Sequence, residues 1–266
     1  MENILNKMPP FEAGSVWLVG AGPGDAGLLT LYAYEALRQA DVLVYDALVG
    51  QDILELTGPD TILEYAGKRG GKPSPKQNDI TERLIALARE GKKVLRLKGG
   101  DPYIFGRGGE EALTLAAHNV PFRVIPGISS GVGGLAYAGI PLTHRETNSA
   151  VTFLTGHDAS GKIPNVNWDH IAKGSPVIVV YMGVKHIRSI SERLIRYGRN
   201  KSESVAIIFK ATTEDQKVVI TTLETAADDL NKSKLKPPAL IVIGDVVKLR
   251  PELDWYGKFL ALGAKG

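Results

Sequence analysis

The chain has 266 residues, of which 44% are hydrophobic and 23% are charged, the balance of a globular protein with an apolar core. No apolar run reaches the ~20 residues that a membrane-spanning helix needs, and residues 1–14 lack the pattern of an export signal. Cys is absent, which excludes disulfides, thiolate metal ligands and a cysteine nucleophile, and fits a reducing cytoplasm. The net charge of +3 is spread along the chain, whereas nucleic-acid binding favours a denser basic stripe.

The first half of the sequence alternates β-type apolar runs with helical patterns. Strands are predicted at 16–19, 42–45, 62–65, 94–97 and 122–125. Helices with Leu and Ala on one face are predicted at 28–40, 78–90 and 109–118. Strands separated by helices imply crossover connections, and therefore a mostly parallel sheet.

This pattern breaks near 139–145, and a second series begins. Strands are predicted at 151–154, 177–181, 205–209, 218–221 and 239–243, and helices at 184–197 and 223–230. The third and fourth of these strands follow each other too closely for a helix, which predicts a hairpin. The sequence therefore predicts two α/β domains, at 15–142 and 143–256, with an N-terminal extension at 1–14 and a tail at 257–266.

A glycine-rich loop follows the first strand. Residues Gly22 to Gly27 satisfy G-x-G-x-x-G, and Asp46 ends the second strand about 20 residues later, as in a dinucleotide-binding fold. Pro23, however, removes a backbone N–H from the loop that should hold a pyrophosphate. NAD binding therefore stays an alternative, beside a tight turn with no ligand.

The richest segment follows the strand at 94–97, with five glycines between 99 and 109. A glycine backbone can approach a ligand closely, and open parallel sheets bind ligands at the carboxyl ends of their strands. Asp101 can accept hydrogen bonds from a ribose or an amino group. Arg107 and Glu110 stand at a predicted helix start, where Glu110 and Glu111 either cap the helix or serve a ligand.

A third turn, at 126–131, follows the strand at 122–125 and opens a helix. Ser129 and Ser130 are suited either to bind a ligand carboxylate, with help from the helix N–H groups, or to cap that helix.

Several strings, taken in order, resemble those of the uroporphyrinogen-III C-methyltransferases, a group of tetrapyrrole methylases. They are VGAGPGD (19–25), VYD (44–46), GKR (67–69), LKGGDP (97–102), FGRGGEE (105–111), PGI (126–128), GIPLTHR (139–145) and YM (181–182). The resemblance runs from about Ser15 to Trp255. It implies two α/β domains, each a mixed or mostly parallel sheet flanked by helices, with the active site in the cleft between them.

The resemblance also implies S-adenosylmethionine as the methyl donor, S-adenosylhomocysteine as its product and a homodimer, with no nucleic acid and no membrane as partners. The matching donor-binding positions are Pro23, Gly99, Gly100, Asp101, Ile104, Ser129, Ser130, Met182, Ala211 and Ala239. The family commonly has Thr-Ala where this chain has Ser129 and Ser130. No metal is implied, and the five His are scattered without ligand spacing.

The implied reaction methylates C2 and C7 of uroporphyrinogen III to give precorrin-2, for cobalamin or siroheme synthesis. Because this substrate carries many carboxylates, Lys68, Arg107 and Arg145 are predicted to bind it. The resemblance implies acid–base roles for Asp46 and Lys68 and admits Arg107 as a base. The high pKa of Arg favours Arg107 as an anchor that Glu110 orients.

Two alternatives to this reaction remain. One is another enzyme of the same fold, namely a later precorrin methyltransferase or a relative acting on RNA or in the diphthamide pathway. The other is a tetrapyrrole carrier without catalysis. The strings around Arg107 and Arg145 favour the early substrate.

Overall fold

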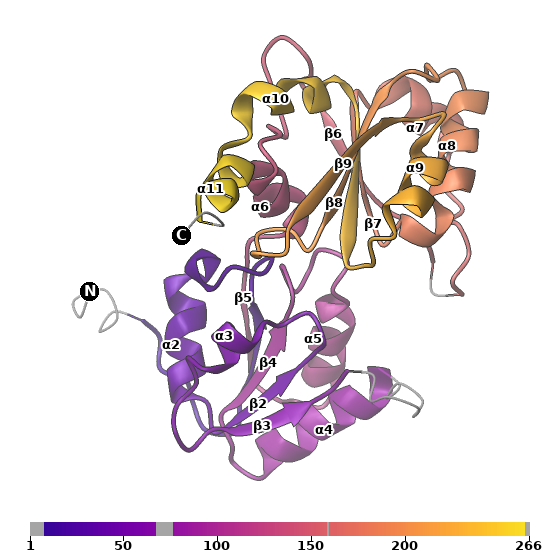
Figure 1. Ribbon diagram of the computed structural model, residues 1–266. Coiled ribbons are helices and arrows are strands. Elements are labelled where there is room, and N and C mark those ends of the chain that lie inside the picture. The colour runs from indigo at the N-terminus through magenta and orange to yellow at the C-terminus, as the bar shows by residue number, and fades with distance from the viewer. Residues whose placement is uncertain (1–7, 68–76, 159, 264–266) are drawn as a thin grey trace. The chain divides into compact units, whose positions relative to one another are not determined.

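The computed structural model describes residues 8–67, 77–158 and 160–263, which form two compact units (Figure 1). Unit 1 ends at Ser129 and unit 2 begins at Ser130. Helix α6 (Ser130–Tyr137) therefore groups with unit 2, although the sequence places it at the end of the first domain. The predicted domain limits at 142 and 143 stay predictions, and each unit is described by itself.

Unit 1 contains a five-stranded sheet in which every pair of neighbouring strands is parallel. Its strands are β1 (Val16–Gly20), β2 (Val42–Tyr45), β3 (Ile62–Tyr65), β4 (Val94–Lys98) and β5 (Phe122–Ile125), in the order β3-β2-β4-β1-β5. The five strands and the parallel sheet predicted for the first half are thus confirmed. They form because each strand is a short β-branched and Leu-rich run bounded by turn residues.

Helices cover both faces of this sheet (Figure 1). The helices α2 (Leu31–Gln39) and α3 (Gln51–Leu54) pack on one face, and α4 (Gln77–Arg89) and α5 (Gly108–Ala117) on the other. Strands β1 and β4 are neighbours, yet β1 leads to α2 on one face and β4 leads to α5 on the opposite face. Ligands of open α/β sheets bind at such a switch point, beyond the carboxyl ends of the strands.

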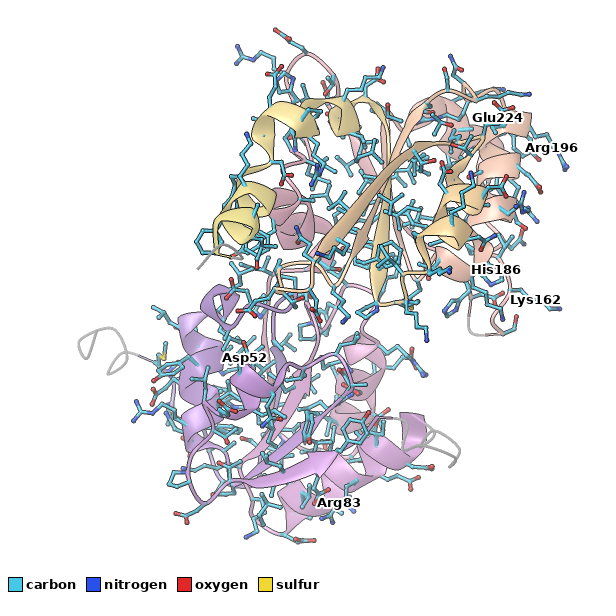
Figure 2. All side chains as sticks on the ribbon, in the orientation of Figure 1. Asp52, Arg83, Lys162, His186, Arg196 and Glu224 are labelled. Carbon is cyan, nitrogen blue, oxygen red and sulfur yellow. The ribbon has the colours of Figure 1, made fainter. Side chains whose placement is uncertain are left out.

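Strand β3 forms one edge of the unit 1 sheet. Arg83 of α4 reaches over to Glu64 of this strand and donates two hydrogen bonds to its carboxylate, from Nε at 3.0 Å and Nη2 at 2.6 Å (Figure 2). Both side chains are partly exposed, so the pair contributes at most about 1 kcal/mol to stability.

Unit 2 contains a mixed sheet. Its strands are β6 (Val151–Thr155), β7 (Val177–Tyr181), β8 (Ser204–Phe209), β9 (Lys217–Thr222) and β10 (Ala239–Ile243), in the order β6-β7-β10-β8-β9. Only β6 and β7 pair in parallel, and the other neighbours are antiparallel. The predicted hairpin is confirmed as β8 and β9, which pair antiparallel.

Three helices pack on one face of the unit 2 sheet: α7 (Trp168–Gly174), α8 (Ile187–Arg196) and α9 (Ala226–Ser233). In α8 the buried residues Ile187, Ile190 and Leu194 follow helical spacing, which is why the sequence predicts this helix. The predicted helix is divided, however, because its first turn is the 3-10 helix η2 (Val184–His186).

The chain ends in a 3-10 helix, η3 (Asp245–Leu249), followed by α10 (Arg250–Leu253) and α11 (Trp255–Gly263). Helix α11 includes residues 257–263, which the sequence assigns to a tail. Trp255 holds α11 to α6, because its Nε1 donates a hydrogen bond to the Ala136 carbonyl at 3.0 Å and its ring contacts Tyr137. Among the described helices, none is long and apolar enough to cross a membrane.

Candidate functional site

Three loops meet at the carboxyl edge of the unit 1 sheet, where Gly20, Gly100 and Gly127 follow or end β1, β4 and β5. A Cβ added to Gly20 would lie 2.5 Å from the Gly100 oxygen and 2.5 Å from the Gly127 nitrogen. Gly22 and Gly100 also exchange backbone hydrogen bonds, at 3.1 and 2.6 Å. The loops are therefore in backbone contact, and a side chain at Gly20 cannot be accommodated there.

Asp101 holds the same junction together. One of its carboxylate oxygens accepts the Gly127 N–H at 3.0 Å, and the other accepts the Tyr103 N–H at 2.8 Å. The carboxylate thus joins the loop after β4 to the loop after β5. Each oxygen keeps further acceptor capacity, so this role is compatible with contact to a ligand.

We expect Gly20→Ala to lower the free energy of unfolding by about 1–3 kcal/mol, because the new methyl group would meet backbone atoms that cannot rotate away. Gly109→Ala is the matched control, since nothing lies within 4 Å of a Cβ there and Ala favours a helix. Urea unfolding measures both changes. Equal stability of the two variants would contradict the close packing of the junction.

Six of the predicted donor-binding residues belong to unit 1, and all lie in or directly after these three loops. They are Pro23, Gly99, Gly100, Asp101, Ile104 and Ser129. Gly99 faces Leu48, whose Cβ would lie 2.7 Å from an added Cβ. The parallel sheet thus brings together residues that are more than a hundred positions apart in the chain.

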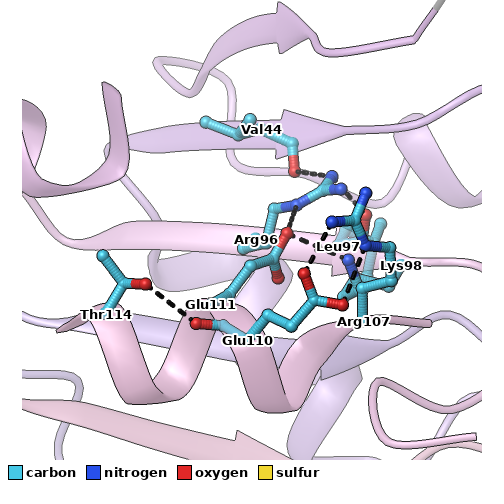
Figure 3. Close-up of polar contacts among 8 residues, drawn as sticks. All are labelled: Val44, Arg96, Leu97, Lys98, Arg107, Glu110, Glu111 and Thr114. Atoms are coloured by element: carbon cyan, nitrogen blue, oxygen red, sulfur yellow. Dashed lines mark hydrogen bonds and ion pairs between the residues drawn. The ribbon is translucent and has the colours of Figure 1, made fainter. Parts of the chain in front are cut away.

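Arg107 and Glu110 form an ion pair at the start of α5 (Figure 3). Arg107 Nε and Nη2 donate to the two Glu110 oxygens at 3.0 and 2.6 Å, which lowers the pKa of the Glu110 carboxyl. More than half of each side chain is exposed. Arg107 has a left-handed backbone, with φ of 59°, a conformation that is uncommon for residues other than glycine.

A second ionic group, formed by Arg96, Lys98 and Glu111, lies beside this pair (Figure 3). Glu111 Oε1 accepts from Arg96 Nε at 3.2 Å and from Lys98 Nζ at 3.1 Å. At most 4% of each of these three side chains is exposed. Sequence analysis missed this group. The sequence nevertheless contains a signal for it. Arg96 and Lys98 lie two positions apart on a buried strand and therefore on the same face, and buried cations require a carboxylate partner.

Asp46 follows β2 at the same edge of the sheet and is half-buried. Its Oδ1 accepts the Leu48 N–H at 3.0 Å, which fixes the carboxylate at the start of the next loop. Lys68, the other residue for which an acid–base role is predicted, lies outside the described residues.

Unit 2 gathers its four predicted donor-binding residues at one edge of its own sheet. Met182 follows β7, Ala211 follows β8, Ala239 begins β10 and Ser130 begins α6. The residues after β7 and β8 share this edge with the start of β10, because β10 runs antiparallel to both strands.

Helix α6 is anchored to this edge of unit 2. The Gly131 N–H donates to the Tyr181 hydroxyl at 2.9 Å, and a Cβ on Gly134 would lie 2.8 Å from the Ala211 Cβ. Met182 is 43% exposed and has a positive φ of 55°, so the turn after β7 presents this side chain outward.

Arg145 lies in an exposed loop of unit 2 that Asn148 holds in shape. The Asn148 amide donates to the carbonyls of Leu142 and Ala150 at 3.1 and 3.2 Å, and its oxygen accepts the His144 N–H at 3.0 Å. Arg145 forms no ion pair within the described part of the chain, so its guanidinium can meet an anion. Among the described residues, no three carboxylate or imidazole side chains are grouped so as to hold a metal ion.

Comparison with known proteins identifies the family. The tetrapyrrole (corrin/porphyrin) methylases match residues 15–227, which is most of the chain. The chain belongs to this family. A uroporphyrinogen-III C-methyltransferase from Sinorhizobium sp. is 62% identical over 97% of this chain and 92% of its own length. A siroheme synthase from Sodalis glossinidius is 48% identical over 97% of this chain, which spans only 54% of that longer protein.

A solved tetrapyrrole methylase has the same fold. The uroporphyrin-III C-methyl transferase from Thermus thermophilus, complexed with S-adenyl homocysteine, is 40% identical and superimposes with a TM-score of 0.78. The match covers 88% of this chain and 99% of that structure. The predicted fold class, two α/β domains built on mixed or mostly parallel sheets, is therefore confirmed.

The methylase fold also explains the misleading glycine motif. A dinucleotide-binding fold places the glycine motif at the opening of the helix that follows. Here the motif runs into the short 3-10 helix η1 (Ala26–Leu28), which Asp25 caps, and α2 opens only at Leu31. The geometry that would favour NAD is therefore not found.

Proposed function

We propose that this chain transfers methyl groups from S-adenosylmethionine to C2 and C7 of uroporphyrinogen III, giving precorrin-2 and two S-adenosylhomocysteines. The observation that carries the proposal is 62% identity to a uroporphyrinogen-III C-methyltransferase over nearly the full length of both chains. The likeness to siroheme synthases supports a product used for siroheme, cobalamin or both.

The described residues fit the proposed donor. At the junction of the three loops, Gly100 and Gly127 stay partly exposed and carry no side chain, which allows close approach of a nucleoside. Asp101, held by two backbone N–H groups, has acceptor capacity for a ribose or an amino group. Met182 in unit 2 adds exposed apolar surface at one edge of its sheet, whereas Ala211 is largely buried there. The proposal requires both sets of residues to contact one ligand.

When bound, S-adenosylmethionine supplies an electrophilic methyl carbon on a sulfonium sulfur, which keeps the electron pair of the broken bond. Asp46 is then the base that accepts the proton that the methylated ring releases, because a carboxylate at a strand's carboxyl edge is well placed for this step. The predicted acid–base role of Lys68 stays part of the proposal.

Arg107 and Arg145 bind the carboxylates of the substrate in this scheme. Glu110 raises the pKa of Arg107 further above its ordinary value through two hydrogen bonds. This argues against Arg107 as a base and favours a charged anchor, because a guanidinium presents paired donors to a carboxylate. In this scheme Glu110 fixes the orientation of the Arg107 guanidinium.

We expect Arg107→Lys to lower kcat/KM for methyl transfer by about tenfold or more. The reason is that a lysine ammonium cannot pair with Glu110 and at the same time donate two parallel hydrogen bonds to a substrate carboxylate. The Kd for S-adenosylhomocysteine should change less than about twofold. Arg83→Lys is the matched control, since Arg83 forms the same two-point contact with Glu64 in unit 1. Equal losses of turnover and donor affinity in Arg107→Lys would contradict its substrate-side role.

Mass spectrometry after incubation with uroporphyrinogen III and S-adenosylmethionine tests the function itself. The tetrapyrrole should gain the mass of two methyl groups. Unchanged tetrapyrrole that stays bound to the protein would indicate a carrier, and methylation of only a later precorrin would indicate another enzyme of the family.

The proposal also includes a cytoplasmic homodimer that needs no metal. The donor and the proton acceptor in the scheme are organic groups, so a chelator should leave turnover unchanged. Analytical sedimentation, at the enzyme concentrations used in the activity assay, tests whether the protein is a dimer.

A further inference from the structure

Helix α6 of unit 2 depends on contacts with the rest of its unit. It has only eight residues, and its sequence, SGVGGLAY, contains three glycines, which disfavour a helix interior. So short and glycine-rich a segment does not form a stable helix by itself. Its conformation and its position are therefore set by the groups that bind its two ends, and α6 begins with Ser130, one of the predicted donor-binding residues.

Tyr181, the last residue of β7, binds the first turn of α6. Its buried hydroxyl accepts the Gly131 N–H at 2.9 Å, and a Cβ on Gly131 would overlap that hydroxyl. The next residue in the chain, Met182, turns away with a left-handed backbone. One phenol oxygen thus joins the turn that carries Met182 to the helix start that carries Ser130.

Gln216, directly before β9, binds the other end of α6. Its buried side-chain amide bridges two backbone groups: Nε2 donates to the Tyr137 carbonyl at 3.1 Å, and Oε1 accepts the Thr212 N–H at 2.8 Å. Tyr137 is the last residue of α6, and Thr212 belongs to the loop after β8. The amide therefore joins that loop to the helix.

The loop after β8 needs such support. Ala211 stands between Lys210 and Thr212, which have positive φ values of 43° and 68°. Residues other than glycine rarely adopt this conformation, and they keep it where neighbouring contacts hold the backbone. The Gln216 bond to Thr212 is one such contact, and the close packing of Ala211 against Gly134 of α6 is another. The position of Ala211 therefore depends on α6 and on Gln216.

We propose that Tyr181 and Gln216 are positioning residues for the methyl donor, because they hold the two ends of α6. Through these contacts they keep Ser130, Met182 and Ala211 in place at one edge of the unit 2 sheet. The inference rests on the proposed function, in which those three residues contact S-adenosylmethionine. Its distinct content is that two buried polar side chains, acting through other residues, set the affinity for the donor.

The first experiment is calorimetric titration of Tyr181→Phe and Gln216→Met with S-adenosylhomocysteine. Each substitution nearly keeps the size of the side chain and removes its hydrogen bonds to the backbone. We expect the Kd to rise by about threefold to tenfold in each variant, the range that one or two lost hydrogen bonds allow. The reason is that the arrangement of α6 that binds the donor would be populated less in the free protein.

Ser175→Ala and Thr221→Val are the matched controls, because they remove buried hydroxyls from the opposite ends of the same two strands. Ser175 precedes β7, and its hydroxyl shares a hydrogen bond with Thr152 at 2.6 Å. Thr221 lies near the end of β9, and its hydroxyl donates to Asp229 at 2.7 Å. Both controls should keep the Kd within about twofold of the native value, since neither changes a contact of α6.

Steady-state kinetics provide a second measurement that a merely structural role would not change. In Tyr181→Phe and Gln216→Met, the KM for S-adenosylmethionine should rise by about the same factor as the Kd. The kcat at saturating donor and the KM for the tetrapyrrole should stay within about twofold of the native values. Loss of folded protein alone would instead lower kcat and leave both KM values unchanged.

A native Kd in Tyr181→Phe, which removes a single oxygen atom, would overturn the inference even if Gln216→Met failed to fold. Equal rises of the Kd in the two control variants would overturn it as well. The titration needs no methyl acceptor. A native protein that binds S-adenosylhomocysteine but methylates no uroporphyrinogen III would therefore contradict the proposed function, while the calorimetric comparison would still decide the inference. A native protein that bound no S-adenosylhomocysteine would contradict both.

Discussion

Asp46→Asn should lower kcat for methyl transfer by about 10²- to 10⁴-fold, while the Kd for S-adenosylhomocysteine changes less than about twofold. Asn keeps the shape of the side chain and an oxygen that can accept the Leu48 N–H, which Asp46 now accepts at 3.0 Å. What it loses is the ability to take up a proton. Single-turnover methyl transfer and calorimetric titration with S-adenosylhomocysteine measure the two quantities.

Asp41→Asn is the control for this change. Asp41 precedes β2, at the opposite end of the strand from Asp46, and its carboxylate likewise accepts a backbone N–H, from Lys93 at 2.8 Å. We expect its kcat to stay within about threefold of the original. If Asp46→Asn lost no more activity than Asp41→Asn, another residue would have to accept the proton.

Glu111→Gln should lower the free energy of unfolding of unit 1 by about 3–5 kcal/mol, since the buried side chains of Arg96 and Lys98 would lose their shared counter-charge. No part of the Glu111 side chain is exposed, so water cannot replace the carboxylate without opening the structure. Urea unfolding followed by hydrogen exchange in peptides from β1 and β4 reports on unit 1 by itself.

The next residue provides the control for this prediction. Glu110 belongs to the same turn of α5 and also pairs with a cation, but 59% of its side chain is exposed. Glu110→Gln should therefore cost less than about 1 kcal/mol. Similar losses of stability from the two substitutions would show that Glu111 does not support a buried charge group.

The positions of the strands and of the candidate site in unit 1 follow largely from local sequence. Short β-branched runs separated by amphipathic helices predict a parallel sheet, and such a sheet places the residues after its strands at one edge. The resemblance to the tetrapyrrole methylases implied that Pro23, Gly99 and Ser129 bind one donor, and the parallel sheet explains how residues so far apart in the chain can lie at one edge. The same logic predicted the hairpin of β8 and β9, because no helix fits between them.

Other features depend on contacts between distant residues. Arg96 and Lys98 lie 15 and 13 positions before Glu111, and the pattern of the strand does not show which carboxylate will face them. Glu111 was expected to cap a helix or serve a ligand, yet the packing of α5 turns it toward the sheet. Asp101 likewise joins two loops through Gly127, 26 positions away.

The sequence by itself determined the family, the two α/β halves and the loops that carry the candidate residues, because these depend on local periodicity and on strings of adjacent residues. Only the tertiary structure decided which charges are buried together and which glycines meet. Those properties depend on the register of β2, β4 and β1 and on the face that α5 covers, and neither is encoded in any single segment.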